Sequence, residues 1–294
     1  MKIPHNGFIL LAILMTGMKG YGQKKAIVFF QTDWGRTTSI DAFCEKTKAA
    51  GYDGIEVWLP SSLEDQSKLK DALKKHNLKI GFLGGTNKSL PFEESLKAYG
   101  DHLKKLASWS PEYINCHTGS DFFTFEQNKA FIEAANRISK ESNIPIYHET
   151  HRGRFSYTLP DTKEYLSKIP DLKLNLDISH WMVVHESLLE SNDNDLEEVI
   201  AHTGHLHARV GHAEGPQVND PEAPEWKTAV ERHLDIWEKI IQNHWKTNDT
   251  FTITTEFGPA TYMPTLPYTR VPVADQWKAN LYMMKVIKDR MQVE

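Results

Sequence analysis

Three carboxylates and one histidine stand at the ends of four apolar segments in the second half of the chain. In residues 173–178, apolar side chains alternate with Asn175 and Asp177. A period of two is typical of a β-strand with two different faces, so the polar face of this segment ends on a carboxylate. The same alternation in residues 144–150, 205–210 and 251–257 gives equivalent inward positions to Glu149, His207 and Glu256.

This set of residue types is suited to binding a metal ion. A buried carboxylate is costly unless a cation or another partner stands opposite, and three converging carboxylates would repel one another. Hard oxygen ligands with one imidazole nitrogen suit one divalent ion such as Mn²⁺, Mg²⁺, Co²⁺ or Zn²⁺. We therefore predict a metal site made by Glu149, Asp177, His207 and Glu256. Taken singly, each could instead be an acid paired with arginine or a structural histidine.

The elements that would position these residues form a regular series. Short β-rich segments alternate with longer amphipathic ones, several of which open on Ser or Thr as helix N-caps do. The predicted strands are residues 26–31, 54–59, 79–83, 113–117, 144–150, 173–178, 205–210 and 251–257. Eight such units indicate an α/β fold, a single (β/α)₈ TIM barrel with its site at the C-terminal strand ends. A doubly wound sheet is the alternative, but QTDWGRTTS after the first strand has no Gly-rich phosphate turn.

Composition narrows the class of protein. The chain has 294 residues, of which 40% are hydrophobic and 25% charged, as in globular proteins with a large core. Its formal net charge of −5 makes nucleic acid a poor partner. Cys44 and Cys116 are its two cysteines, and we expect two buried thiols rather than a disulfide.

The first 22 residues differ from the rest. Lys2 precedes an apolar run at residues 8–15, and Gly20 and Gly22 occupy the −3 and −1 positions of a cleavage site. This pattern predicts a signal peptide over residues 1–22, a barrel domain over residues 23–294 and an exported protein, periplasmic or secreted. The apolar run is too short to span a bilayer and no cysteine follows it, so no membrane anchor is expected. A buried N-terminal helix is the alternative.

Several motifs carry a resemblance to a known family. They are GYDGIEVW, NCHTG, HETH, LDISH, HLHARVG and TTEFGP, and they extend over nearly the whole chain after the leader. The chain resembles the xylose-isomerase-like TIM barrel superfamily, which includes sugar isomerases and epimerases, inosose dehydratases and the AP endonucleases of family 2. The resemblance implies metal binding by the same four residues. It also implies that His180, three residues after Asp177, lies beside the metal and touches the substrate.

The endonuclease branch of that superfamily fits less well. It needs a multinuclear zinc site, whereas this chain has Gly84 and Gly85 where that branch has a histidine, and NDPE where it has Asp-x-His. Together with the negative charge and the leader, these departures argue against DNA repair.

The predicted function is that of a divalent-metal-dependent sugar isomerase or epimerase. It would act on a non-phosphorylated keto-sugar through an enediolate, with Glu149 and Glu256 as base and acid and His180 as the third catalytic residue. A lyase or hydratase of 3-keto-glycosides on the same site is one alternative. A catalytically inactive sugar-binding barrel is another.

Further residues are predicted to bind the carbohydrate substrate. They are Trp34, His117, His151, Arg152, His180, Arg209 and Gln217. For Arg209, a salt bridge to a strand-end acid is an equal alternative. Glu56 is expected to face the barrel interior in a structural role, and His102, His233 and His244 are expected at the helix surface. The sequence leaves a homo-oligomer open.

Overall fold

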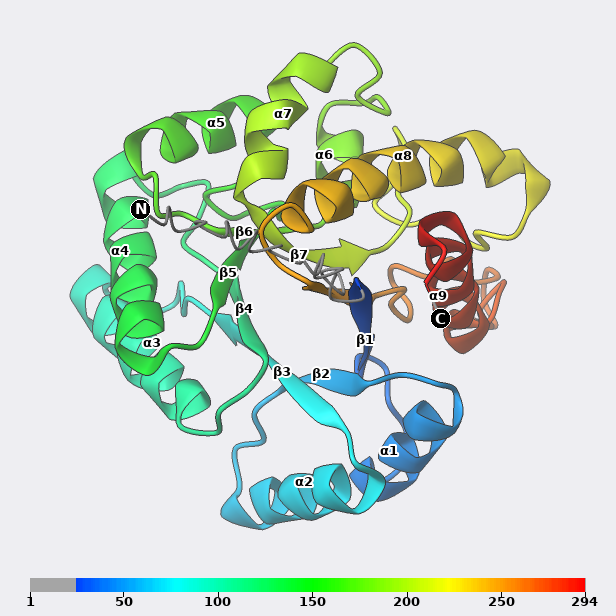
Figure 1. Cartoon of the computed structure of the whole chain (residues 1–294), viewed down its shortest axis with the longest axis horizontal. Coiled ribbons are helices and arrows are strands. Elements are labelled where there is room, and N and C mark those ends of the chain that lie inside the picture. The colour runs from blue at the N-terminus through cyan, green and yellow to red at the C-terminus, as the bar shows by residue number, and fades with distance from the viewer. Residues whose placement is uncertain (1–24, 294) are drawn as a thin grey trace, which may run out of the picture.

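The computed structural model describes residues 25–293, and its centre is a closed barrel of eight parallel strands (Figure 1). Each strand pairs with the next, and β1 closes the barrel on β8. The strands are β1 (Ala26–Thr32), β2 (Gly54–Trp58), β3 (Lys79–Gly85), β4 (Tyr113–His117), β5 (Ile146–Glu149), β6 (Leu174–Leu176), β7 (Thr203–Ala208) and β8 (Thr250–Thr255). The predicted TIM barrel is confirmed, and closure rules out the open sheet.

Helices surround the barrel on all sides (Figure 1). They are α1 (Ile40–Ala49), α2 (Leu63–His76), α3 (Phe92–Ala107), α4 (Phe125–Ser142), α5 (Leu159–Lys168), α6 (Ser179–Val184), α7 (Asp193–His202), the short 3₁₀ helix η1 (Pro224–Trp226), α8 (Lys227–His244) and α9 (Gln276–Met291). Ser39, Ser62 and Thr124 cap α1, α2 and α4, since each side-chain oxygen accepts from the backbone amide three residues on. The last helix completes the ring, because Trp277 of α9 packs against Phe43 of α1.

The sixth strand is shorter than the alternation predicted. It ends at Leu176, and α6 begins at Ser179. The Asp177 carboxylate accepts from both the backbone amide and the hydroxyl of Ser179, which turns the chain out of the sheet. Asp177 therefore lies at the barrel mouth, just past the last paired residue.

Side chains fill the lower part of the barrel interior. Phe30 of β1 and Tyr113 of β4 are fully buried and meet edge to face, with ring centroids 5.0 Å apart. The ring of His205 lies 4.0 Å from that of Tyr113. Because these side chains fill the interior, space for a site remains only near the C-terminal ends of the strands.

Other predictions can be placed on the fold. Cys44 and Cys116 are buried and free, as expected. The surface position predicted for His233 is wrong, because its side chain is fully buried on the inner face of α8. None of the helices between residues 25 and 293 has the length and apolar character needed to cross a membrane. The predicted leader at residues 1–22 lies outside the described part of the chain.

Candidate metal centre

The barrel brings together the four residues that the alternation singled out. Glu149 ends β5, Asp177 follows β6, His207 lies in β7 and Glu256 follows β8. One ligand atom from each lies within 4.8 Å of the others, and all four side chains are buried. Strands that are distant in sequence thus deliver one cluster of oxygen and nitrogen atoms.

Two atoms of this cluster lack hydrogen-bond partners. His207 Nδ1 lies 2.9 Å from Glu256 Oε2 and 3.6 Å from Glu149 Oε2, yet neither Nδ1 nor Glu256 Oε2 makes a hydrogen bond within residues 25–293. A buried polar atom without a partner costs about 1–3 kcal/mol. Since these atoms converge with the oxygens of two further acids, the residues present fit a metal ion and can hold one.

Glu149 is kept ionised by its neighbours. Its Oε2 accepts from Asn115 Nδ2 at 2.6 Å and lies 3.0 Å from His117 Nε2. Burial raises the pKa of this carboxyl, but His117 and His207 outweigh burial and hold it well below its usual range. An ionised carboxylate at this position is available as a ligand or as a base.

Arg209 forms a salt bridge to a strand-end acid, one of the two roles that the sequence allowed for it. Its Nη2 contacts Asp177 Oδ2 and lies 3.4 Å from Glu256 Oε2. Burial raises the pKa of Asp177 to about 6 against the opposing charge of Arg209. For Glu256, burial also raises the pKa, but His207 and Arg209 bring it below its usual value. Arg209 therefore offsets part of the negative charge of the cluster.

His180 lies behind the cluster and is fully buried. Arg152 Nε donates to its Nδ1 at 3.0 Å, and Arg209 Nη2 lies 3.0 Å from its Nε2. Burial lowers the pKa of His180 well below its usual value, and the neighbouring His151 and Arg209 lower it further. A neutral imidazole has one acceptor nitrogen, so His180 accepts from Arg152 through Nδ1 and carries its hydrogen on Nε2.

A cavity of about 220 Å³ opens above the cluster. Its walls include the rings of Trp34 and Tyr262, which meet edge to face with centroids 4.9 Å apart. The full lining is Thr32, Asp33, Trp34, Trp58, Leu83, His117, Glu149, His151, Arg209, Glu256 and Tyr262. This lining contains no lysine among the described residues, and its one arginine is already paired with Asp177.

The sequence model of the family described as xylose isomerase-like TIM barrel matches residues 44–241, about two thirds of the chain. The protein belongs to this family. The search of curated proteins found no match.

Solved structures of similar fold cover nearly the whole xylose isomerase-like chain. The 3-keto-D-glucoside 4-epimerase YcjR from E. coli is 14% identical, with a TM-score of 0.60 over 90% of this chain and 99% of that one. The probable 3-DHS dehydratase AsbF from Bacillus anthracis is 17% identical, with a TM-score of 0.56 over 89% and 98%. A xylose isomerase-like protein from Mycobacterium smegmatis in complex with magnesium is 12% identical, with a TM-score of 0.57 over 87% and 91%. At these identities the likeness establishes the shared fold.

The predicted substrate residues fall into two groups in this xylose isomerase-like barrel. Trp34, His117, His151 and Arg209 line the cavity together with Glu149 and Glu256. Three others stand outside its lining. His180 is buried, Arg152 donates to His180 and to the hydroxyl of Tyr262, and Gln217 joins two loops through both hydrogen bonds to the backbone of Gly258.

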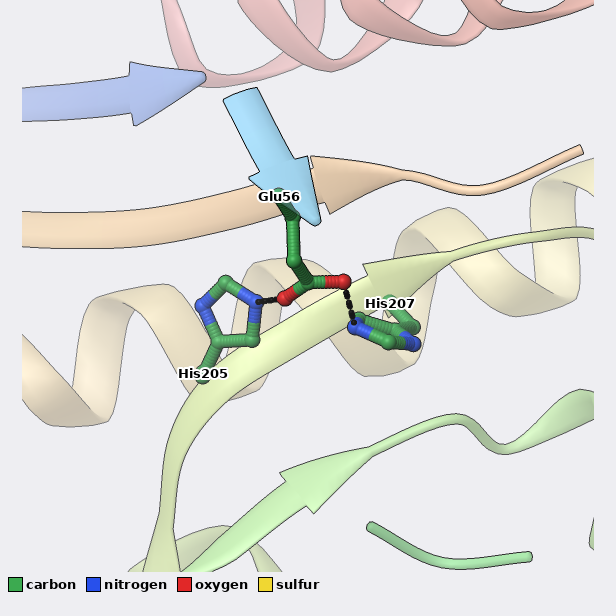
Figure 2. Close-up of side chains that lie close together, drawn as sticks. All are labelled: Glu56, His205 and His207. Carbon is green, nitrogen blue, oxygen red and sulfur yellow. Dashed lines mark ion pairs between the residues drawn. The ribbon is translucent and has the colours of Figure 1, made fainter. Parts of the chain in front are cut away.

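Two residues of the site were not predicted to act there. Tyr262 lies in the loop after β8, where no periodic pattern marks it. Glu56 was assigned to the interior, and its carboxylate lies between the rings of His205 and His207 (Figure 2). Glu56 Oε1 is 2.9 Å from His207 Nε2, and Oε2 is 3.8 Å from His205 Nε2. The alternation of Gly54, Glu56 and Trp58 along β2 was the signal that Glu56 points toward this cluster.

Proposed function

We propose that this protein is a divalent-metal-dependent enzyme that moves a proton at the carbon next to the carbonyl of a non-phosphorylated keto-sugar, giving an epimer or an isomer. One observation carries the proposal. Glu149 and Glu256 belong both to the candidate metal centre and to the wall of the cavity above it. Two carboxylates are therefore held where a substrate chelated by the metal would expose its C–H bonds.

The two carboxylates approach the cavity from different sides. Glu149 comes from β5 and Glu256 from the end of β8, three strands further around the closed barrel. Glu149 would take the proton, because His117 and His207 keep it ionised, and Glu256 would return a proton from the other side. When bound, the divalent ion would polarise the carbonyl and stabilise the negative charge that develops beside it.

The cavity wall supports a neutral sugar as substrate. Trp34, Trp58 and Tyr262 offer aromatic faces on which the C–H side of a sugar ring can stack. The lining has three acids, Asp33, Glu149 and Glu256, against the single guanidinium of Arg209. A phosphate group would meet more negative than positive charge there. The leader pattern at residues 1–22 also supports an exported protein that meets free sugars.

Elimination from a 3-keto-glycoside is the second candidate. Trp58 is 48% exposed at the rim of the cavity. Trp58 and Asp33 also line a second hollow of about 540 Å³ between α1 and α2, where a glycosidic substituent has room. The solved structures of the 4-epimerase and the dehydratase support both outcomes on this fold.

Incubation of the Mn²⁺-loaded protein in D₂O separates the candidates. An epimerase or isomerase should place deuterium at the carbon next to the carbonyl of free ketoses or 3-keto-glucosides. Release of the aglycone from a 3-keto-glycoside without epimer formation would favour the lyase. A protein that binds sugar tightly but catalyses neither reaction would be a binding protein. In that case Glu256→Gln should leave the affinity for sugar unchanged.

A further inference from the structure

We propose that Glu56 is a positioning residue that sets the tautomer of His207 and so directs His207 Nδ1 to the metal. This inference rests on the metal centre of the proposed function. Glu56 lies in β2 and does not line the cavity, so it has no direct contact with a substrate held there.

The two nitrogens of His207 face different surroundings. Nδ1 faces the cluster, 2.9 Å from Glu256 Oε2 and 3.6 Å from Glu149 Oε2, whereas Nε2 lies 2.9 Å from Glu56 Oε1. An imidazole binds a metal through an unprotonated nitrogen and carries its hydrogen on the other one. A metal held with Glu149 and Glu256 must therefore use Nδ1, and the hydrogen must sit on Nε2, against Glu56.

One neighbour could oppose this arrangement. Asn115 Nδ2 lies 3.2 Å from His207 Nε2 and could donate to it, which would place the ring hydrogen on Nδ1. The same Asn115 nitrogen has two hydrogens and donates one of them to Glu149 Oε2 at the shorter distance of 2.6 Å. If Nε2 were unprotonated, its lone pair would face Glu56 Oε1 at 2.9 Å, an oxygen that makes no hydrogen bond to any residue between 25 and 293. The carboxylate therefore favours hydrogen on Nε2.

The carboxylate of Glu56 is held firmly enough to act this way. Thr254 of β8 donates its hydroxyl to Glu56 Oε2 at 3.4 Å, and the hydroxyls of Thr254 and Tyr113 are 2.8 Å apart. Among residues 25–293, the ion pairs of Glu56 are with His205 and His207, and none is with lysine or arginine. A fully buried carboxylate whose ion pairs are with histidine alone is costly as a purely structural element.

Mn²⁺ affinity measured by calorimetry tests the role without any substrate. We expect Glu56→Ala to weaken Mn²⁺ binding by about 10–100-fold, the usual effect of removing an outer-shell partner. Glu56→Gln keeps the shape and one acceptor oxygen, so we expect a smaller loss and a native unfolding temperature. Glu112→Gln, which breaks a surface pair with Lys79, is the matched control and should bind Mn²⁺ like the wild type.

The tautomer itself gives a second readout. In the Zn²⁺-loaded protein, nitrogen-15 NMR should show His207 protonated at Nε2 and metal-bound at Nδ1. Protonation at Nδ1, or an unchanged Mn²⁺ affinity in a folded Glu56→Gln and Glu56→Ala pair, would overturn the role of Glu56 and leave the metal centre standing. A wild-type protein that binds no Mn²⁺ would overturn both.

Discussion

Arg209 and Asp177 form a buried ion pair at the edge of the candidate metal centre, with Arg209 Nη2 in contact with Asp177 Oδ2. The same guanidinium lies 3.4 Å from Glu256 Oε2. Arg209 therefore neutralises charge when no ion is present and competes for the same carboxylates as an ion would.

Replacing Arg209 should separate these two effects. In Arg209→Met the cluster loses its fixed cation, so the metal-free protein should be less stable by about 3–5 kcal/mol, the cost of leaving a buried carboxylate unpaired. Mn²⁺ should then raise the unfolding temperature by more than it does in the wild type. Thermal unfolding with and without Mn²⁺ measures both quantities. An equal Mn²⁺ shift in the two proteins would show that the guanidinium does not compete with the ion.

Metal removal should abolish turnover. We expect one divalent ion per chain, loss of activity after treatment with EDTA, and recovery when Mn²⁺ or Mg²⁺ is returned. Elemental analysis of the purified protein gives the stoichiometry. Two ions per chain would point to one of the two further groups of potential ligands, which are His117, Glu149 and His151, and Glu56, His205 and His207. Full activity after exhaustive chelation would contradict the metal-dependent mechanism.

The two cavity carboxylates should each be needed for proton transfer. Glu149→Gln and Glu256→Gln are expected to lower kcat by about 10²–10⁴, the usual contribution of general acid–base catalysis. Deuterium exchange from D₂O into the substrate is the direct measurement. Glu94→Gln, on the exposed face of α3, is the control and should exchange at the wild-type rate. If either site variant exchanged deuterium at the wild-type rate, that carboxylate would not be the group that transfers the proton.

The strands and the four clustered residues could be predicted because both depend on local alternation. A residue at the end of Leu174–Leu176 must follow the pleat of its strand, and closure of the barrel then aligns it with the ends of β5, β7 and β8. The ends of the strands were predicted less exactly. A side chain such as Asp177 can end the pairing of strands by accepting a hydrogen bond from the backbone amide of Ser179.

The remainder of the site depends on tertiary contacts, which the alternation of apolar and polar residues in the sequence does not predict. Tyr262 reaches the cavity from an irregular loop, and its ring lies 4.6 Å from the Arg209 guanidinium. His233 was placed on the surface because it lies on a helix, yet its Nδ1 donates to the backbone oxygen of Ala229 and its Nε2 accepts from the backbone amide of Gly211. The contacts of Tyr262 with Arg209 and of His233 with Gly211 join segments whose approach is set by packing rather than by spacing.

Stability should fall as the pH is lowered below about 6.5. Burial lowers the pKa of His148 to about 3 and that of His233 to about 4. The unfolded chain takes up these protons near pH 6.5, whereas the folded protein stays neutral until much lower pH, so acid favours unfolding. Each of the two groups should remove about 2 kcal/mol between pH 7.5 and 5.

Urea unfolding at pH 7.5 and pH 5 measures this loss. His233→Gln removes one of the two groups, so its free energy of unfolding should depend less steeply on pH than that of the wild type. Equal dependence in the two proteins would show that His233 does not remain neutral in the fold.

Tyr262 should contribute to substrate binding through its ring rather than through its hydroxyl. The ring meets Trp34 edge to face and covers the Arg209 guanidinium, while the hydroxyl accepts from Arg152 at 3.2 Å. Tyr262→Ala should therefore raise KM by about 10-fold, in line with the loss of aromatic and cation–π contacts. Tyr262→Phe should change KM little. Tyr268→Ala, fully exposed in the same loop, controls for loop effects, and an equal KM change there would remove Tyr262 from the binding site.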